Sequence, residues 1–281
     1  MSLSAKLHKI FKCKRKPTVA VIRLNGVIGK VSNFSNGLTL ESLAFTDKIK
    51  KIPNLAAIAL IINSPGGSPV QSELISKKIR SLAENKKGKP IPIISFCEDV
   101  AASGGYWLAL TGDEIYASNS SIIGSIGVIS SGFGFQEAIK KLGIERRVYS
   151  QGKNKSVLDP FTKSKAEDVE LIKTIQKDIH GSFIDFAKER RKDKITAKDD
   201  EVFNGRFWSG KEAKTLGLID NIGFYEEVLK ERYGKDVILK NIEGSKGFFR
   251  KKLAANLQIS AMKTIANDFI EEISHWSRYK L

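Results

Sequence analysis

The sequence predicts an α/β domain with a mostly parallel sheet and flanking helices. Short apolar runs rich in β-branched residues alternate along the chain with stretches whose apolar residues recur at helical spacing. Such runs are typical of buried strands, and their alternation with helices is typical of a parallel sheet. A chain of 281 residues could form one large domain or two small ones, but it has no internal repeat or low-complexity linker. We therefore expect a single domain with two appended ends.

The expected elements follow in chain order, separated by turn signals such as Asn25-Gly26 and Pro65-Gly66-Gly67. Short stretches that contain apolar, β-branched or aromatic residues predict strands at residues 18–24, 56–62, 91–96, 114–117, 146–149 and 237–239. Apolar residues three and four positions apart predict helices at residues 38–49, 73–84, 136–142, 164–192, 209–216 and 225–233, with others from 106 and from 253. Residues 120–129 combine Gly, Ser and Ile, a pattern of close backbone approach.

The chain is strongly basic, with a formal net charge of +16. Hydrophobic residues at 41% and charged residues at 28% are ordinary for a globular protein, so the distribution of charge is the informative feature. Basic residues gather in the first sixteen positions, which contain no acid, and in the run Arg250-Lys251-Lys252. This predicts an anionic partner such as a membrane surface, with an ordinary solvated basic surface as the alternative. No aromatic and basic platform for single-stranded nucleic acid is present, so no nucleic-acid partner is expected.

The cysteines and the hydropathy pattern limit the class further. Cys13 and Cys97 lie far apart in different contexts, which predicts neither a disulfide framework nor a metal site. The longest apolar run covers residues 55–62, against roughly twenty residues for a membrane span. The N-terminus lacks the apolar stretch of a secretory signal. We therefore expect a protein that is cytoplasmic or peripheral to the membrane.

Ser103 is the first candidate for chemistry. It lies in Ala102-Ser-Gly-Gly-Tyr-Trp107, between an expected strand and an expected helix. Small neighbours let a substrate carbonyl approach closely, and the amides at the helix start can stabilise negative charge. The alternative is that Ser103 only caps the helix.

A serine nucleophile needs a base, and the chain offers few histidines for that role. His8 and His275 lie in the terminal segments, and His180 lies on the expected long helix without an orienting motif, so a Ser-His-Asp triad is not expected. The remaining candidate is a lysine, which accepts a proton only where burial lowers its pKa. Lys155 stands out because it lies in a polar turn followed by apolar residues, although a solvated loop lysine is the alternative.

Several motifs, taken together in this order and spacing, resemble the signal peptide peptidase A (protease IV) family over residues 18–235. They are Asn63-Ser-Pro-Gly-Gly67, Ala102-Ser-Gly-Gly-Tyr-Trp107, Ile123-Gly-Ser-Ile-Gly-Val128, Lys155-Ser-Val-Leu-Asp-Pro-Phe161 and Gly205-Arg-Phe-Trp-Ser-Gly-Lys-Glu-Ala213 with the following Leu216-Gly-Leu-Ile-Asp220. The resemblance implies a ClpP/crotonase-like fold.

The resemblance also implies a mechanism. Ser103 would be the nucleophile, Lys155 the general base and Ser125 the residue that hydrogen-bonds the lysine, with Gly67 and Gly104 in the oxyanion hole. Neither a cofactor nor a metal is implied. Substrates would be peptides, such as released signal peptides or other apolar peptides. Half-size family members assemble as rings in which the dyad is shared between neighbouring subunits, and we expect the same arrangement.

The expected organisation has three parts: a basic N-terminal arm at 1–17, a Ser-Lys peptidase domain at 18–240 and a basic amphipathic C-terminal segment at 241–281. Family members commonly carry an N-terminal membrane helix where this sequence has its basic arm. Two other functions are compatible with the predicted fold. One is a crotonase-like acyl-CoA enzyme, which leaves Ser103 and Lys155 together unexplained, and the other is a catalytically silent membrane-associated scaffold.

Overall fold

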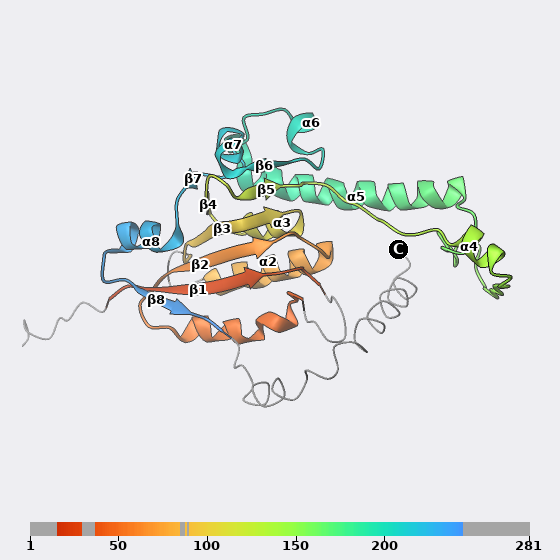
Figure 1. The fold of residues 1–281 in the computed structure, drawn as a ribbon. Coiled ribbons are helices and arrows are strands. Elements are labelled where there is room, and N and C mark those ends of the chain that lie inside the picture. The colour runs from red at the N-terminus through yellow and green to blue at the C-terminus, as the bar shows by residue number, and fades with distance from the viewer. Residues whose placement is uncertain (1–15, 30–36, 85–87, 89, 244–281) are drawn as a thin grey trace, which may run out of the picture.

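A computed structural model of the chain describes residues 16–29, 37–84, 88 and 90–243. Eight strands form a single sheet (Figure 1): β1 (Thr18–Asn25), β2 (Leu55–Ser64), β3 (Ile93–Ala102), β4 (Glu114–Ala117), β5 (Ile122–Gly124), β6 (Phe207–Ser209), β7 (Asn221–Ile222) and β8 (Ile238–Asn241). Their main order is β6-β5-β3-β2-β1-β8, and β4 joins β3 to β7 beside this path. Every pair is parallel except β5 with β6, which confirms the predicted class.

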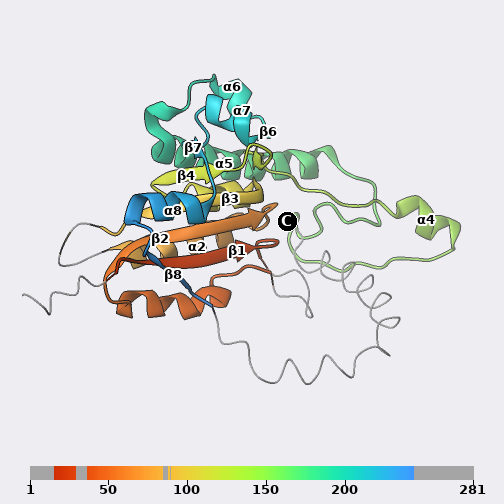
Figure 2. The same cartoon turned by 60° about the vertical axis from the view of Figure 1, so that its left-hand side comes forward.

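Helices flank this sheet, except for α4, which lies beyond it (Figures 1 and 2). They are α2 (Pro69–Ala83), α3 (Gly104–Ala109), α4 (Gln136–Lys141), α5 (Ala166–Arg191), α6 (Asp199–Val202), α7 (Gly210–Thr215) and α8 (Tyr225–Tyr233), with 3₁₀ helices η1 (Glu41–Lys51) and η2 (Lys192–Lys194). The helix expected at 38–49 is thus a 3₁₀ helix. Its buried residues Leu43, Thr46 and Ile49 recur every third position, which suits three residues per turn.

Two apolar clusters lie on opposite faces of the sheet, as side-chain alternation along strands requires. On one face Ile22 and Leu60 pack with Ile75 of α2 and Tyr106 of α3. On the other face β-strand residues that include Ile61, Phe96 and Tyr116 pack with Leu229 of α8. The apolar runs of β1, β2 and β3 therefore serve both layers, which explains why they are nearly continuous.

Strand β3 is longer than the sequence predicts, and its extra length positions the candidate serine. It pairs with β4 over residues 94–97 and then with β5 over residues 100–102. Polar Glu98 and Asp99 lie where the partner changes, and the register with β2 shifts at the same level. The strand therefore ends at Ala102, directly before Ser103.

Residues 128–165, here called the extension, include α4. They project beyond the sheet together with the first turns of α5 (Figures 1 and 2). The prediction of a strand at residues 146–149 is wrong, because this stretch forms no ladder and every residue from 141 to 155 is exposed. Residues that favour strands form one only where a neighbouring strand supplies hydrogen bonds. The amphipathic helix expected from 253 and almost all of the N-terminal arm lie outside the described residues. Among the described helices, none is long and apolar enough to cross a membrane.

Helix α5 joins the extension to the body, and its last turns are firmly anchored there. Trp107 of α3 packs against Phe183 and Phe186 of α5, with ring centroids 5.0 and 4.8 Å apart. Arg191, which is 2% exposed, donates to Asp220 at 2.8 Å and to the Gly217 carbonyl at 2.8 Å. The helix that carries the extension is therefore fixed to the helix that follows Ser103.

Replacing Arg191 with methionine should destabilise the domain by about 3 kcal/mol, because it removes one partner of a buried ion pair. Lys194 also contacts Asp220 at 2.6 Å but is half exposed, so Lys194→Gln should cost less than about 1 kcal/mol. Denaturant midpoints of the two variants measure this difference. Equal midpoints would show that burial of the Arg191 pair contributes nothing to stability.

Candidate active site

Ser103 occupies a strained turn between β3 and α3. Its backbone angles are φ 52° and ψ −124°, in a region that residues with a side chain rarely adopt. The turn is held from both sides, because the Ser103 amide donates to the Gly124 carbonyl at 2.8 Å while its carbonyl accepts from the amides of Tyr106 and Trp107. Strain maintained in this way is typical of functional positions.

The helix-cap alternative for Ser103 receives no support from this geometry. Ser103 precedes the first residue of α3, yet its side chain makes no capping hydrogen bond. By contrast, Ser68 and Ser209 cap α2 and α7 through their hydroxyls. Ser103 is half-buried as a residue, and its hydroxyl is not committed to the helix.

The loop after β2 lies directly against this turn. A Cβ atom on Gly66 would lie 2.8 Å from the Ser103 Cβ and 2.9 Å from the Gly104 nitrogen, so only glycine allows this approach. The sequence indicates the loop through its Gly-Gly pair, but it does not single out Gly66. Ser64 adds a further contact that sequence reasoning missed, since its buried hydroxyl accepts from the Gly66 amide at 3.2 Å.

Gly67 and Gly104 lie close to one another beside Ser103. The Ile28 amide donates to the Gly66 carbonyl and the Ile28 carbonyl accepts from the Ser68 amide, each at 2.8 Å. Because the Gly66 carbonyl and the Gly67 N–H point to opposite sides of one peptide plane, the Gly67 N–H is directed away from Ile28. A Cβ on Gly104 would lie 3.4 Å from the Gly67 nitrogen. The Gly67 nitrogen therefore lies close to Gly104, on the side of the loop that faces the Ser103 turn.

Ser125 lies at the carboxyl end of β5, next to the Ser103 turn. Gly124, the residue before it, accepts the hydrogen bond from the Ser103 amide, and the Ser125 amide donates to the Arg206 carbonyl at 2.7 Å. Ser125 also has a positive φ of 54°. His180 lies close to this segment, but its Nε2 contacts the Ile126 carbonyl at 3.1 Å, and its bonds include none to Ser103.

Lys155 lies apart from these residues within one chain. It is exposed in the loop between α4 and α5, in the part of the molecule that projects away from β3 and α3 (Figure 1). The apolar residues after it do not bury it, since Leu158 is itself 38% exposed. The structure thus brings together Ser103, Ser125, Gly67 and Gly104, and it leaves Lys155 in the exposed loop between α4 and α5.

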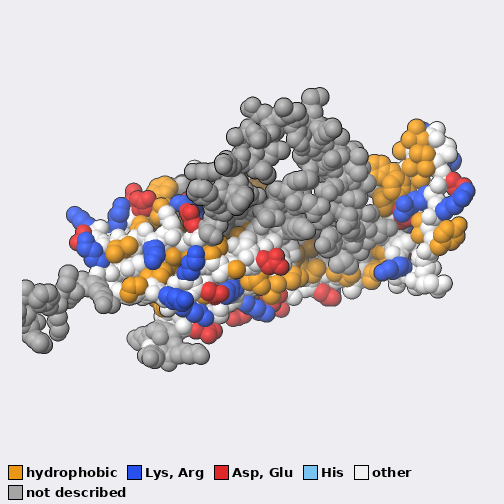
Figure 3. Space-filling model, turned by 90° about the horizontal axis from the view of Figure 1, so that it is seen from below, with side chains coloured by type: hydrophobic (Ala, Val, Ile, Leu, Met, Phe, Trp, Pro, Cys, Tyr) orange, Lys and Arg blue, Asp and Glu red, His pale blue; other side chains and the backbone are white. Residues whose placement is uncertain are grey.

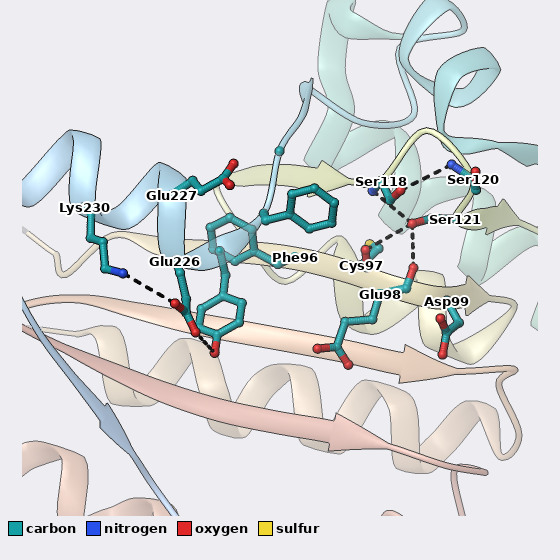
Figure 4. Close-up of a pocket in the computed structure, with 13 residues that line it drawn as sticks. Phe96, Cys97, Glu98, Asp99, Ser118, Ser120, Ser121, Glu226, Glu227 and Lys230 are labelled. Atoms are coloured by element: carbon teal, nitrogen blue, oxygen red, sulfur yellow. Dashed lines mark hydrogen bonds and ion pairs between the residues drawn. The ribbon is translucent and has the colours of Figure 1, made fainter.

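A separate cavity of about 730 Å³ lies near the start of α8 (Figure 4). It is lined by Phe96, Cys97, Glu98, Asp99, Ser118, Ser120, Ser121, Gly223, Phe224, Tyr225, Glu226, Glu227 and Lys230. Burial raises the pKa of the Cys97 thiol to about 12, so this thiol stays protonated and is a poor nucleophile. The cavity contains none of the candidate catalytic residues. No group of side chains suited to a metal ion occurs within the described ranges.

Comparisons with known proteins identify the chain's family. The model of peptidase family S49 matches residues 83–237. The chain is 44% identical to the Na(+)/H(+) antiporter NhaA of Brucella abortus, over 94% of this chain and 37% of that protein. It is 33% identical to the chloroplastic serine protease SPPA of Arabidopsis thaliana, over 73% of this chain and 30% of that protein. The chain therefore spans about a third of the length of these two relatives.

A solved structure shares the fold. It is a lysine-to-alanine mutant of the 1510-N membrane-bound stomatin-specific protease in complex with a substrate peptide, and it aligns with a TM-score of 0.51 at 17% identity over 86% of this chain and 100% of that chain. The mostly parallel sheet and its flanking helices place the domain in the ClpP-like α/β fold class. Within that class, the chain belongs to peptidase family S49, the signal peptide peptidase A (protease 4) family.

Proposed function

We propose that this chain is an endopeptidase that uses a Ser-Lys dyad. The Ser103 Oγ attacks the substrate carbonyl while Lys155 accepts its proton, and Ser125 orients the lysine. The amides of Gly67 and Gly104 stabilise the oxyanion that forms. The observation that carries this proposal is the strained Ser103 turn, whose uncapped serine lies against the Gly66-Gly67 loop and is hydrogen-bonded to Gly124, the residue before Ser125. The catalytic domain corresponds to residues 18–240, a span that contains β1 and most of β8.

Lys155 reaches Ser103 of a second copy of this chain. The extension exposes large apolar side chains: Ile129 (88%), Phe133 (81%), Leu142 (72%), Ile144 (54%) and Tyr149 (92%). Figure 3 shows hydrophobic side chains at the end of the molecule where α4 lies. Contiguous exposed apolar surface is typical of protein interfaces. Assembly of copies into a ring would cover this surface and remove water from Lys155, as a lysine base requires.

The substrates are peptides with small and apolar side chains, such as released signal peptides. Apolar residues remain exposed beside the Gly67 loop, namely Val27 (45%) and, on the first two turns of α2, Val70 (62%) and Leu74 (38%). They offer an apolar surface to an extended peptide. The substrate peptide named for the solved relative supports a peptide as the class of substrate.

A serine-directed fluorophosphonate probe tests the proposal against a silent scaffold and an acyl-CoA enzyme. The probe should label Ser103, located by peptide mass spectrometry, and the wild-type chain should cleave a peptide library that Ser103→Ala leaves intact. A folded chain that neither reacts with the probe nor cleaves any peptide would contradict the proposal and favour the scaffold.

Ser125→Ala should lower turnover about tenfold without abolishing it, because Ser125 orients the base and does not attack. Ser121→Ala is a suitable control on the neighbouring loop, since its hydroxyl bonds to the backbone of β3, away from Ser103. Steady-state kinetics of both variants measure the effect. If Ser125→Ala leaves the rate and its pH profile unchanged, Ser125 is only structural.

A further inference from the structure

One buried carboxylate lies at the centre of the extension. From residue 127 to residue 182, Asp159 alone is classed as buried, at 5% exposed. Burying a charged group is unfavourable unless it is paired and hydrogen-bonded. The burial of a charged side chain here, where no apolar residue is buried, therefore indicates a role other than filling a hydrophobic core.

Asp159 connects two segments of the extension that lie apart in the sequence. The Arg146 guanidinium donates to Asp159 Oδ2 through Nε at 3.1 Å and Nη2 at 3.0 Å, and it lies 4.8 Å from the centre of the Phe161 ring. The Phe161 amide donates to the other carboxylate oxygen at 3.1 Å, and the Thr162 hydroxyl donates to the Asp159 carbonyl at 3.2 Å. Both Arg146 nitrogens donate to the same carboxylate oxygen, and the Phe161 amide holds the other oxygen, so both oxygens of Asp159 are fixed by charge-assisted hydrogen bonds.

This fixed point lies four residues after Lys155. A chain of four residues spans at most about 14 Å, so the position of Asp159 limits where Lys155 can lie. The intervening Leu158 has a positive φ of 51°, and its amide donates to Asp168 in the first turn of α5 at 3.2 Å. On the other side, the Lys155 amide closes a turn onto the Gly152 carbonyl at 3.2 Å. The loop is thus restrained on both sides of the lysine although nearly all of it is exposed.

We propose that Arg146 and Asp159 are positioning residues that hold the loop in the conformation that presents Lys155. This inference rests on the proposed function of Lys155 as the base. An error of about 1 Å in placing a reacting group can lower a rate about a hundredfold. No apolar side chain from residue 127 to residue 182 is buried, so the loop depends for its rigidity on this buried ion pair together with the contact between the Phe135 and Phe161 rings.

Two variants break the pair while keeping side-chain size similar, namely Arg146→Gln and Asp159→Asn. Each should lower kcat at least about tenfold, with KM changed less than about twofold. Arg147→Gln is the matched control, because Arg147 is the adjacent arginine and pairs at 2.6 Å with Glu145 at the exposed surface. It should keep wild-type kinetics. Arg146→Lys, which keeps the charge but loses the two-pronged contact, should fall between the control and Arg146→Gln.

Amide hydrogen exchange provides a readout that does not depend on activity. Asp159→Asn should accelerate exchange in residues 150–162 while the sheet keeps its protection and the assembly keeps its size. Unchanged exchange, wild-type kcat in Asp159→Asn, or a kcat loss that coincides with dissociation of the assembly would each overturn the inference. Lys155→Ala separates this failure from failure of the proposed function. If the Lys155→Ala enzyme is active, Lys155 is not the base and the proposed Ser-Lys dyad is wrong. If Lys155→Ala is inactive but Asp159→Asn is active, only the positioning role of Asp159 is wrong.

Discussion

Ser103→Ala is expected to abolish peptide hydrolysis while the domain remains folded. The substitution removes one hydroxyl that makes no capping hydrogen bond, so little packing and no cap are lost. Without the nucleophile no acyl-enzyme can form, and the rate should fall by at least about a thousandfold. Turnover of a library-derived peptide and the melting temperature, measured on the same preparation, check both parts of the expectation.

Ser103→Gly sharpens this test because it changes the backbone as well as the hydroxyl. Glycine adopts a φ of 52° without strain, so the variant should be inactive and also more stable by about 1 kcal/mol. A serine that served as a helix cap would behave differently, since Ser103→Ala would then cost about 1 kcal/mol with activity retained. Retained turnover in either variant would eliminate Ser103 as the nucleophile.

Lys155→Arg is expected to be inactive although it keeps the positive charge. A guanidinium does not give up its proton in proteins, so it cannot accept the proton of Ser103. Lys153→Arg is the matched control, because Lys153 lies in the same loop and makes an exposed ion pair with Glu167 at 3.2 Å. The control should keep most of the wild-type rate.

Steady-state kinetics and binding of a noncleavable peptide distinguish loss of the base from loss of the site. Lys155→Arg should bind the peptide as the wild type does, because the residue acts on the proton and not on substrate affinity. An active Lys155→Arg enzyme would show that a charge at this position suffices, and the base would have to be sought elsewhere.

The central strands and the serine turn are the parts that sequence reasoning predicts best. Apolar β-branched runs define β1, β2 and the first half of β3 because burial on both faces leaves little room for polar residues. The second half of β3 is not predicted from the sequence, since Glu98 and Asp99 interrupt the apolar pattern where the strand changes partner from β4 to β5. Local pattern carries no information about which neighbour a strand pairs with.

The extension shows a different limit. Val148 and Tyr149 are residue types that favour strands, but in the described chain no neighbouring strand completes a ladder with residues 146–149. The sequence indicates Lys155 and the motif around it, whereas the burial of Asp159 and its contact with Arg146 depend on how distant parts of the loop meet. Types of residue can be read from the chain, but distances between them cannot.

Mixing two inactive variants tests the shared dyad most directly. Ser103→Ala and Lys155→Ala chains, combined in equal amounts with subunit exchange confirmed by mass spectrometry, should recover about a quarter of the wild-type activity. That fraction follows because one site in four then pairs an intact Ser103 with an intact Lys155 from the next copy. A dyad formed within one chain gives no recovery, since each chain lacks one of its two residues. Absence of activity in the exchanged mixture would contradict a site shared between copies.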